Sequence, residues 1–459
     1  MTLRWTFVIW IFWAGIASAS QMVEALLAQA GLDGKASVVL MDVQTGKMVE
    51  AVSPRKSLPP ASVAKAVTVP YALNALGSGF RFQTRVIATG PVQNGRVQGD
   101  LILQGGGDPL LDTDGLFKMA EALKAQGIKG ITGDFLYSDG AISNVAYVDN
   151  EQPEWVGYNP ALSGLNLNFN RVFFQWKDGA LSLTAKSDNH APAVSGVAIA
   201  LTDKADPVFK YGTSKGREVW TIARPALQKN GSRWLPVRDP GKYAAEVFQT
   251  LAKDNGVQLP TPKRSNGSIE GTVLASQSGA DLVALGRGML KFSTNLSAEI
   301  VGMRASAALG RAPSDHTQSA KRMTDWAKTE YGVNGISFRD HSGLSDTSKA
   351  TSKALATIMR AEARKGLYPA LLKDIPIEAT DAITVRAKTG SLNFVSTLAG
   401  VIEGPNGQYA FSIMMADEAR RAAAKRAGDE RPAGARTWIK SARNVQKEIL
   451  AYWAGVYLE

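Results

Sequence analysis

Strand-forming segments lie near both ends of the 459-residue chain, and their separation constrains the fold more than any other feature of the sequence. Residues 36–52 read ASVVLMDVQTGKMVEAV, with β-branched side chains on both sides of Thr45-Gly46, which predicts a hairpin. Residues 382–415 predict three more strands, AITVRAKTG, FVSTLAGVI and QYAFSIMM, whose short links favour antiparallel pairing. We expect both ends to belong to one mixed α/β domain that is split in the sequence.

A long β-rich region separates the two parts of this domain. Alternating strand patterns such as DLILQGG and RVFFQWKDGALSLTA predominate there, interrupted by one helix near residues 113–126. The size of the region is typical of separate domains. We therefore expect a split domain around an insertion of one or two small β-rich domains, with residues 20–85 and 241–459 forming the split domain and residues 86–240 the insertion.

Helical patterns fill most of the chain after this insertion. They run from Tyr243 through about Arg364, and the segment 418–434, rich in Ala and Arg, predicts a solvated loop. A last helix then repeats apolar residues at helical spacing, and its apolar face predicts packing on the sheet rather than on a membrane. These residues are Trp438, Ala442, Val445, Ile449 and Trp453.

The first 19 residues have the pattern of a secretory signal peptide. Arg4 precedes an apolar run that closes on Ala17-Ser18-Ala19, and the run is shorter than the roughly 20 residues that cross a bilayer. The chain has no cysteine, so disulfides and thiolate nucleophiles are excluded. Its net charge of +11 favours an anionic partner, but no nucleic-acid-binding motif is present. We expect an exported protein that does not bind nucleic acid.

The segment PPASVAKAVTVPYALNAL, residues 59–76, places a serine and a lysine at the start of an apolar helical pattern. Ser62 and Lys65 are three residues apart and share a helix face, which sets an amine beside a hydroxyl. Backbone N–H groups at a helix start stabilise an oxyanion, and a partly desolvated lysine beside another cation releases its proton more readily. A capping serine followed by a surface lysine has the same spacing, as has SPRK in the predicted loop 53–56, so other motifs must support this assignment.

A second motif with related chemistry is KTG at Lys388, Thr389 and Gly390, at the end of a predicted strand. A strand edge holds an extended peptide in register, the lysine and threonine grip a terminal carboxylate, and the glycine permits close backbone approach. A strand-ending turn has the same composition, so this motif also gains weight only from the others.

The third motif of this set is Ser-x-Asn, for which the chain offers two candidates. SDN at residues 187–189 is the closer literal match, but it ends an alternating strand inside the predicted insertion. Ser293 and Asn295, in STN, lie between two helical patterns, where a short loop projects a hydroxyl and an amide into a cleft. We therefore select Ser293 and Asn295.

These motifs, in this order, resemble those of the low-molecular-mass class C penicillin-binding proteins, the D-alanyl-D-alanine carboxypeptidases and endopeptidases of the bacterial cell wall. The resemblance covers nearly all of the chain after residue 19 and rests also on LILQGGGDPLL, GDFLYSDGAI, LNLNFNRV, DHSGLS and VRAKTGSLNFVSTLAGVI. It implies a penicillin-recognising transpeptidase-like α+β fold, with a five-stranded antiparallel sheet flanked by helices and with inserted domains. One departure is Asp346, which follows SGLS where relatives often carry arginine, and it leaves recognition of the stem peptide's side-chain carboxylate open.

The resemblance also implies a function and a role for each motif residue. It implies a periplasmic serine peptidase, soluble or peripherally associated with wall or membrane, that acts on peptidoglycan stem peptides and is inhibited by covalent binding of β-lactams. Ser62 is expected to attack the penultimate D-Ala carbonyl, with Lys65 as base and Ser293 as proton relay. The oxyanion is expected to bind the N–H groups of Ser62 and Ser391, and the substrate is expected to bind at Asn295, Lys388, Thr389, Gly390 and Ser391.

Three alternatives remain. GTSKG, residues 212–216, matches the G-x-S-x-G motif of Ser-His-Asp hydrolases, but strand patterns on both sides predict a hairpin turn. A β-lactamase shares the three motifs, but the long separation of Lys65 from Ser293 leaves room for an insertion that such enzymes lack. A non-catalytic wall-binding protein of the same fold is the third.

The sequence gives no sign of a metal or an organic cofactor. The three histidines show no metal-ligand spacing, so we expect no catalytic metal and no cofactor. The choice between trimming terminal D-Ala and cutting cross-links stays open, as does the oligomeric state.

Overall fold

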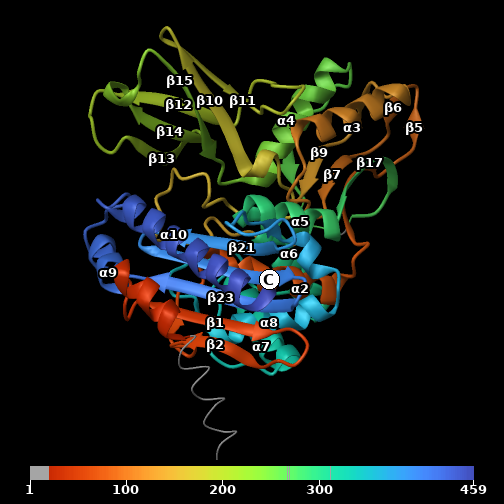
Figure 1. The fold of residues 1–459 in the computed structure, drawn as a ribbon. Helices are drawn as coiled ribbons and strands as arrows, with labels where there is room; N and C mark the ends of the chain where they lie inside the picture. The colour runs from red at the N-terminus through yellow and green to blue at the C-terminus, as the bar shows by residue number, and fades with distance from the viewer. Residues whose placement is uncertain (1–19, 266, 268, 311) are drawn as a thin grey trace, which may run out of the picture. The chain divides into compact units, whose positions relative to one another are not determined.

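The computed structural model describes residues 20–265, 267, 269–310 and 312–459 (Figure 1), so the predicted signal peptide lies outside the described residues. The chain forms two compact units. The first contains the chain up to Asn74, Gly286–Ser293 and Ser319–Glu459, and the second contains Ala75–Leu285 and Thr294–Gln318.

An antiparallel sheet, in which all strands but one are long, forms the centre of the first unit. Its order is β2-β1-β23-β22-β21-β20, so that β1, near the start of the chain, pairs with β23, near its end. The five predicted strands are all present, and the two-residue strand β20 extends the sheet at one edge. The bounds are β1 Ala36–Asp42, β2 Met48–Val52, β20 Lys373–Asp374, β21 Thr384–Leu392, β22 Val395–Gly404 and β23 Gly407–Ala416.

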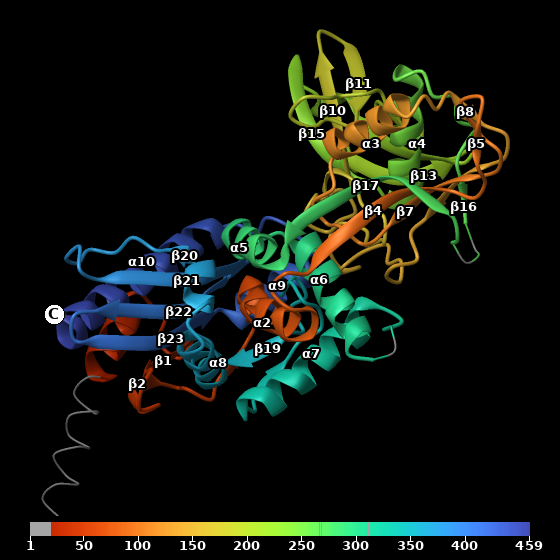
Figure 2. The same ribbon diagram turned by 90° about the vertical axis from the view of Figure 1, so that its right-hand side faces the viewer.

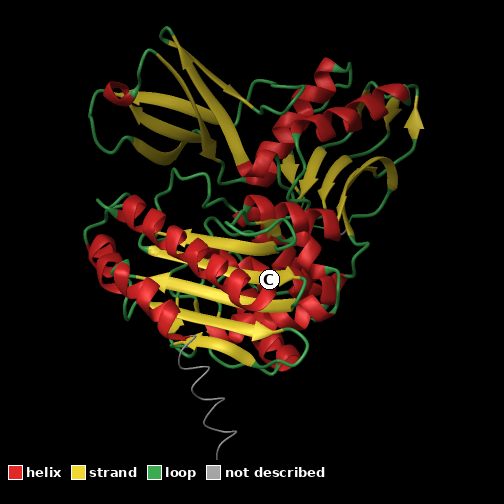
Figure 3. Cartoon of the chain, in the orientation of Figure 1, coloured by secondary structure: helices red, strands yellow, loops and turns green. Residues whose placement is uncertain are grey.

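Helices cover both faces of this sheet because its strands are apolar on both sides. Val38 and Leu40 of β1 point into a core that includes Trp438 and Trp453 of α10, Ala435–Trp453, which lies along the sheet in Figures 1 and 3. Val39, the next residue along β1, packs with Ala356 of α8, Ser352–Arg364, on the opposite face. The predicted packing of the last helix on the sheet is therefore confirmed.

The remaining elements of the first unit are short or lie beside the sheet. They include a helix over residues 20–29, a small sheet β18-β19-β3, and one helix, α9, in the segment for which we predicted a solvated loop. The bounds are β3 Ser57–Leu58, η1 Ala61–Ala64, α2 Lys65–Leu76, α5 Leu282–Phe292, α7 His316–Tyr331, β18 Ile336–Ser337, β19 Lys349–Thr351, η4 Tyr368–Leu371, α9 Glu418–Arg426 and η5 Ala454–Leu458.

Among its described residues, the second unit contains four sheets and three α-helices. The largest sheet has the order β16-β9-β7-β4-β17, and the others are β11-β10-β15, β12-β14-β13 and β5-β6-β8. The bounds are β4 Arg81–Ala88, β5 Val92–Gln93, β6 Arg96–Val97, β7 Leu101–Gly105, α3 Thr113–Ala125, β8 Gly130–Ile131, β9 Phe135–Ser138, η2 Asn168–Asn170, β10 Arg171–Lys177, β11 Ala180–Thr184, β12 Val197–Thr202, β13 Phe209–Ser214, β14 Arg217–Ala223, η3 Arg224–Ala226, β15 Asn230–Pro236, α4 Pro240–Asp254, β16 Lys263–Arg264, β17 Thr272–Asp281 and α6 Asn295–Ala308.

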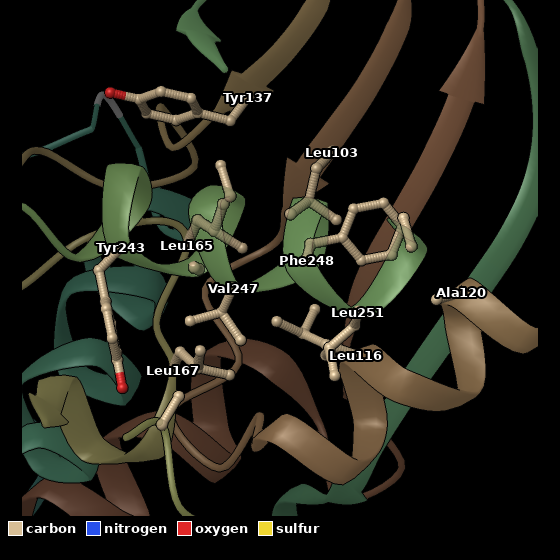
Figure 4. Packing of buried hydrophobic residues seen from close by; sticks show 14 of the residues in the cluster. Leu103, Leu116, Ala120, Tyr137, Leu165, Leu167, Tyr243, Val247, Phe248 and Leu251 are labelled. Atoms are coloured by element: carbon tan, nitrogen blue, oxygen red, sulfur yellow. The ribbon is translucent and has the colours of Figure 1, made fainter. Parts of the chain in front are cut away.

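One apolar core joins the sheets of the second unit to α3 and α4. Figure 4 shows Val247, Phe248 and Leu251 of α4 beside Leu103 of β7 and Leu116 of α3. This core explains why the unit is larger than the predicted insertion of residues 86–240. Helix α4 packs on α3, and β17 pairs with β4, so both belong to this unit rather than to the split domain.

The helical pattern predicted from Tyr243 through about Arg364 is wrong over β17. Its sequence, TVLASQSGAD, is weakly apolar, and it is a strand because β4 offers it a long antiparallel edge. No helix among the described residues combines the length and the apolarity needed to cross a membrane.

Candidate active site

Ser62 and Lys65 meet at the start of α2. Ser62 lies in η1 and is half-buried, whereas Lys65, the first residue of α2, is fully buried. The Nζ of Lys65 donates to Ser62 Oγ at 3.1 Å. The predicted first turn is thus a 3₁₀ turn followed by an α-helix, and it still sets the amine beside the hydroxyl.

The backbone just before Ser62 is strained and held in place from two sides. Ala61 has a φ of 47°, a left-handed conformation that residues other than glycine rarely adopt. Thr397 Oγ1 donates to the carbonyl oxygen of Pro60 at 2.8 Å, and a Cβ on Gly343 would lie only 1.8 Å from the Ala61 carbonyl oxygen. These neighbours hold the backbone that leads into Ser62.

A loop between β18 and β19 supplies the second contact of Lys65. Its Nζ donates to the Ser342 carbonyl oxygen at 2.7 Å. The buried carboxylate of Asp340 accepts hydrogen bonds from the N–H groups of Gly343 and of Ser345, the latter at 2.6 Å, and so closes the loop on itself. Sequence reasoning gave Asp340 no role, although an aspartate three residues before a glycine is a signal for such a side-chain-closed turn.

The KTG strand lies directly beside the serine. Gly390 of β21 stands opposite Thr397 of β22. A Cβ built on Gly390 would lie 2.2 Å from Thr397 Oγ1 and 3.0 Å from the backbone nitrogen of Ser62. No side chain fits there, so glycine allows the close backbone approach that the sequence predicted.

Lys388 brings a second buried amine to the same place. Its side chain is almost fully buried, and its Nζ donates to the Thr389 carbonyl oxygen at 2.6 Å. Burial, together with the positive charges of Lys65 and Lys373, lowers the pKa of Lys388 from 10.5 to about 6. The charge interaction also shows that the amines of Lys65 and Lys388 are close enough to influence one another. Thr389 itself is exposed.

Ser391 follows on β21 and has a partner that the sequence did not indicate. Arg443 of α10 donates from Nη2 to Ser391 Oγ at 2.9 Å. Arg443 lies on the exposed face of α10, and nothing in its local sequence distinguishes it from the other cations of that helix. This hydrogen bond gives the Ser391 hydroxyl a protein partner.

The two residues of the STN motif belong to different units. Ser293 closes α5 in the first unit with a φ of 60°, and its N–H donates to the Met289 carbonyl oxygen at 2.9 Å. Helix α5 contacts α2, because a Cβ on Gly286 would lie 3.3 Å from a methyl group of Val69. Asn295 begins α6 in the second unit, where its amide donates to the Tyr158 carbonyl oxygen at 2.8 Å.

Asp346, the departure from the resembling family, takes part in a small ion-pair cluster with α9. Its carboxylate lies 3.2 Å from Lys425 Nζ and 3.9 Å from Arg421 Nη2. The residue that replaces arginine is therefore held next to two cations from a later part of the chain.

The rejected motifs have other structural roles. Ser187 and Asn189 of SDN hold the carboxylate of Asp114 in the second unit, with Ser187 Oγ donating at 2.5 Å and Asn189 Nδ2 at 2.9 Å. GTSKG forms the tight turn between β13 and β14, as predicted, with Ser214 opposite Arg217. Within the described ranges, no three or more His, Asp or Glu side chains are grouped as a metal site.

A serine that contacts a buried lysine, beside a KTG strand edge of an antiparallel sheet, defines the class of serine hydrolases that use lysine instead of histidine. The chain belongs to the D-Ala-D-Ala carboxypeptidase 3 (S13) family, whose model matches residues 19–434. It is therefore a serine-type D-Ala-D-Ala carboxypeptidase of the low-molecular-mass class C penicillin-binding proteins.

Relatives and solved structures agree with this membership. The chain is 26% identical over 444 residues to a D-alanyl-D-alanine carboxypeptidase of Actinomadura sp. R39, covering 87% of this chain and 81% of the relative. It is 24% identical over 386 residues to carboxypeptidase DacB of Haemophilus influenzae, covering 76% and 78%. A crystal structure of penicillin-binding protein 4 from H. influenzae, complexed with a β-lactam, shares the fold with a TM-score of 0.73 at 20% identity, covering 95% and 99%.

Proposed function

We propose that the chain is an exported enzyme that cleaves the D-Ala-D-Ala bond of peptidoglycan stem peptides through an acyl-enzyme on Ser62. The observation that carries the proposal is the 3.1 Å contact between Lys65 Nζ and Ser62 Oγ, beside Gly390 and Lys388. The proposal assigns Ser62 as nucleophile, Lys65 as base and Lys388 as the group that binds an anion, and the segments that carry them are more than 300 residues apart in the sequence.

Acylation follows from this arrangement. When Lys65 holds the free amine, the Ser62 hydroxyl donates to it, and the proton passes to Nζ as Oγ bonds to the carbonyl carbon of the penultimate D-Ala. In this proposal the tetrahedral intermediate carries its charge on the former carbonyl oxygen, which accepts hydrogen bonds from the N–H groups of Ser62 and Ser391. The C–N bond then breaks, and the departing amine of the terminal D-Ala takes the proton that Lys65 Nζ received, so that Lys65 again holds the free amine.

Deacylation returns the enzyme to its starting state. A water molecule attacks the ester carbon and its proton passes to the amine of Lys65, and the Ser62 oxygen then leaves and regains that proton from Lys65. In this proposal Ser293 relays protons, and Asn295 binds the substrate amide. The Ser342 carbonyl oxygen, 2.7 Å from Lys65 Nζ, holds the amine in position throughout the cycle.

The terminal carboxylate of the peptide is assigned to Lys388 and Thr389. Thr389 is exposed and offers its hydroxyl directly, and Lys388 supplies a positive charge once the carboxylate is present. A penicillin carries a carboxylate and a strained amide in the same relative order, and a related penicillin-binding protein 4 was crystallised with a β-lactam. We therefore propose β-lactams as covalent inhibitors that acylate Ser62.

The proposal is tested by labelling and by product analysis. Wild-type protein is expected to become labelled by fluorescent penicillin and to release D-Ala from a synthetic pentapeptide, and Ser62→Ala is expected to do neither. Labelling of the Ser62→Ala variant would show that the nucleophile is wrong. Parallel incubation with cross-linked muropeptides measures how far the same site also acts as an endopeptidase.

A further inference from the structure

One face of the sheet β11-β10-β15 in the second unit carries aromatic and polar side chains in register. The three strands lie side by side in both views (Figures 1 and 2). The other face packs Val172, Phe174 and Leu235 into the apolar core. Residues directly opposite one another share a face, so the register places two rows on the open face. One row is Thr184, Phe173 and Trp234, and the next is Ser182, Gln175 and Ser232.

Three aromatic rings and two cations form the centre of this face, which we call the aromatic platform: Phe169, Arg171, Phe173, Lys186 and Trp234. The rings of Phe173 and Trp234 have centroids 5.0 Å apart. Lys186 Nζ lies 4.6 Å from the Phe173 centroid, and Arg171 Cζ lies 5.4 Å from the Trp234 centroid. Both rings are only half-buried, so part of each ring is accessible from outside.

A strained turn holds the fifth member of the platform in place. Asn168, Phe169 and Asn170 have φ values of 50°, 57° and 55°, three left-handed residues in succession, and phenylalanine is unfavourable in that region. Asn168 Nδ2 donates to Thr113 Oγ1 at 2.8 Å, and Asn170 Nδ2 donates to the Asn166 side-chain oxygen at 2.7 Å. Both amides are buried, so they anchor the turn and project Phe169 toward Arg171, at 5.2 Å. Such strain concentrates at functional positions.

Arg171 is the most informative residue of the platform. It begins β10, is half-buried between two rings, and its Nε is buried without a hydrogen-bond partner. Burial lowers the pKa of its guanidinium, and within the described part of the chain no carboxylate forms an ion pair with it. A half-buried arginine that is not matched by an acid is suited to an anionic group supplied from outside.

We propose that the aromatic platform binds a peptidoglycan strand, with sugar rings on Phe173 and Trp234 and a stem-peptide carboxylate on Arg171 and Lys186. This inference rests on the proposed function. The face of a pyranose ring presents C–H groups that pack on the electron-rich face of an aromatic ring. The neighbouring row of Ser182, Gln175 and Ser232 offers hydroxyl and amide groups to the sugar hydroxyls. The platform is thus a binding surface for polymeric substrate, separate in its residues from the active site.

The composition of the platform favours a glycan over single-stranded nucleic acid. Nucleic-acid grooves follow the phosphates with many cations, and their affinity depends on that charge. The platform has two cations and three neutral polar side chains in the next row. A glycan with many hydroxyl groups and a few carboxylates matches a surface that has two cations and three neutral polar side chains.

The test compares binding to purified insoluble peptidoglycan sacculi by co-sedimentation, using full-length protein that also carries Ser62→Ala to prevent turnover. The platform variant is Phe173→Ala with Lys186→Ala. The control is Leu181→Ala with Lys210→Ala, since Leu181 is 39% exposed on the other face of β11 and Lys210 is an exposed lysine of β13. The platform variant is expected to bind sacculi about tenfold more weakly, and the control to stay within about twofold.

Further measurements keep the outcomes distinct. In protein that retains Ser62, the platform variant and wild type are expected to release D-Ala from a soluble pentapeptide at the same rate. Absence of that release in wild type refutes the proposed function, whereas unchanged sacculus binding by the platform variant refutes this inference alone. Loss of oligothymidylate binding with sacculus binding retained would assign the platform to nucleic acid. Lys186→Glu alone, at an exposed position, repeats the test if the double variant unfolds.

Discussion

A peptide that ends in a carboxylate is expected to bring a proton with it when it binds to this active site. Burial and the charges of Lys65 and Lys373 lower the pKa of Lys388 to about 6, so that at pH 7 about one free molecule in ten carries the proton there. A carboxylate beside Nζ stabilises the ammonium and raises its pKa by about 1 to 3. Binding at pH 7 is therefore expected to take up roughly 0.4 to 0.9 proton per complex.

Calorimetry measures this uptake directly. Ser62→Ala protein is titrated with an acylated D-Ala-D-Ala peptide in phosphate and in Tris, and the difference in apparent enthalpy gives the number of protons. The same peptide with a C-terminal amide is the matched ligand and is expected to take up no proton. The Lys388→Met variant in the same background is the matched protein.

Two results would refute the reasoning. One is an enthalpy that is the same in both buffers for the carboxylate peptide, because Lys388 would then be charged before the ligand arrives. The other is equal uptake with and without Lys388, because the proton would then bind to another group. Either result would also remove Lys388 as the partner of the terminal carboxylate in the proposed mechanism.

Three further predictions follow from named contacts. At neutral pH Lys388 loses its proton on folding, whereas the unfolded chain keeps it, so the free energy of unfolding rises with pH between about 6 and 10.5. The Lys388→Met variant should therefore be more stable than wild type by on the order of 5 kcal/mol at pH 7 and by much less near pH 10. Denaturant unfolding at the two pH values measures this difference. Gly390→Ala should fold but acylate with penicillin about 100-fold more slowly, because a Cβ there lies 2.2 Å from Thr397 Oγ1; a wild-type rate in stopped-flow fluorescence would contradict this. Asp340→Asn should lower the free energy of unfolding of the first unit by about 2 to 4 kcal/mol, because it weakens charge-assisted bonds to the Gly343 and Ser345 N–H groups; an unchanged unfolding midpoint would count against that role.

The central sheet and the serine–lysine pair were accessible from the sequence because their signals are local. β-branched runs, short links and the three-residue spacing of Ser62 and Lys65 each report on a few neighbouring residues. The meeting of Ser62 with Gly390 was expected only through the family resemblance, and the structure brings the two backbones together. The catalytic and binding roles of the selected residues, including Ser293 and Asn295, stay predictions.

Features that depend on distant partners were missed. Strand β17 forms because it pairs with the edge of β4, and nothing in its own sequence, TVLASQSGAD, indicates this partner. The second unit includes α4 because α4 packs against α3. The boundary that we predicted from composition, at residue 240, separates these two helices. The contact of Arg443 with Ser391 likewise joins two segments that carry no shared pattern.

Helix α9 was missed for a different reason. Its residues are mostly exposed and present no apolar face, so periodicity gave no helix signal. Its alanines favour helix intrinsically, and Asp417 caps it by accepting from the Arg420 N–H at 3.1 Å. The capping aspartate was the available signal, and weighing it above the missing periodicity would have predicted the helix.

The pairing of β1 with β23 has a consequence for the order in which the molecule is made. β1 emerges among the first 42 residues, but its partner is complete only at Ala416. The last residue of the second unit, Gln318, is synthesised about 100 residues earlier. A nascent chain therefore carries an open edge of β1 while the second unit already has every residue that the structure assigns to it, and Ser62 stays without its KTG neighbour until Gly390 has been made.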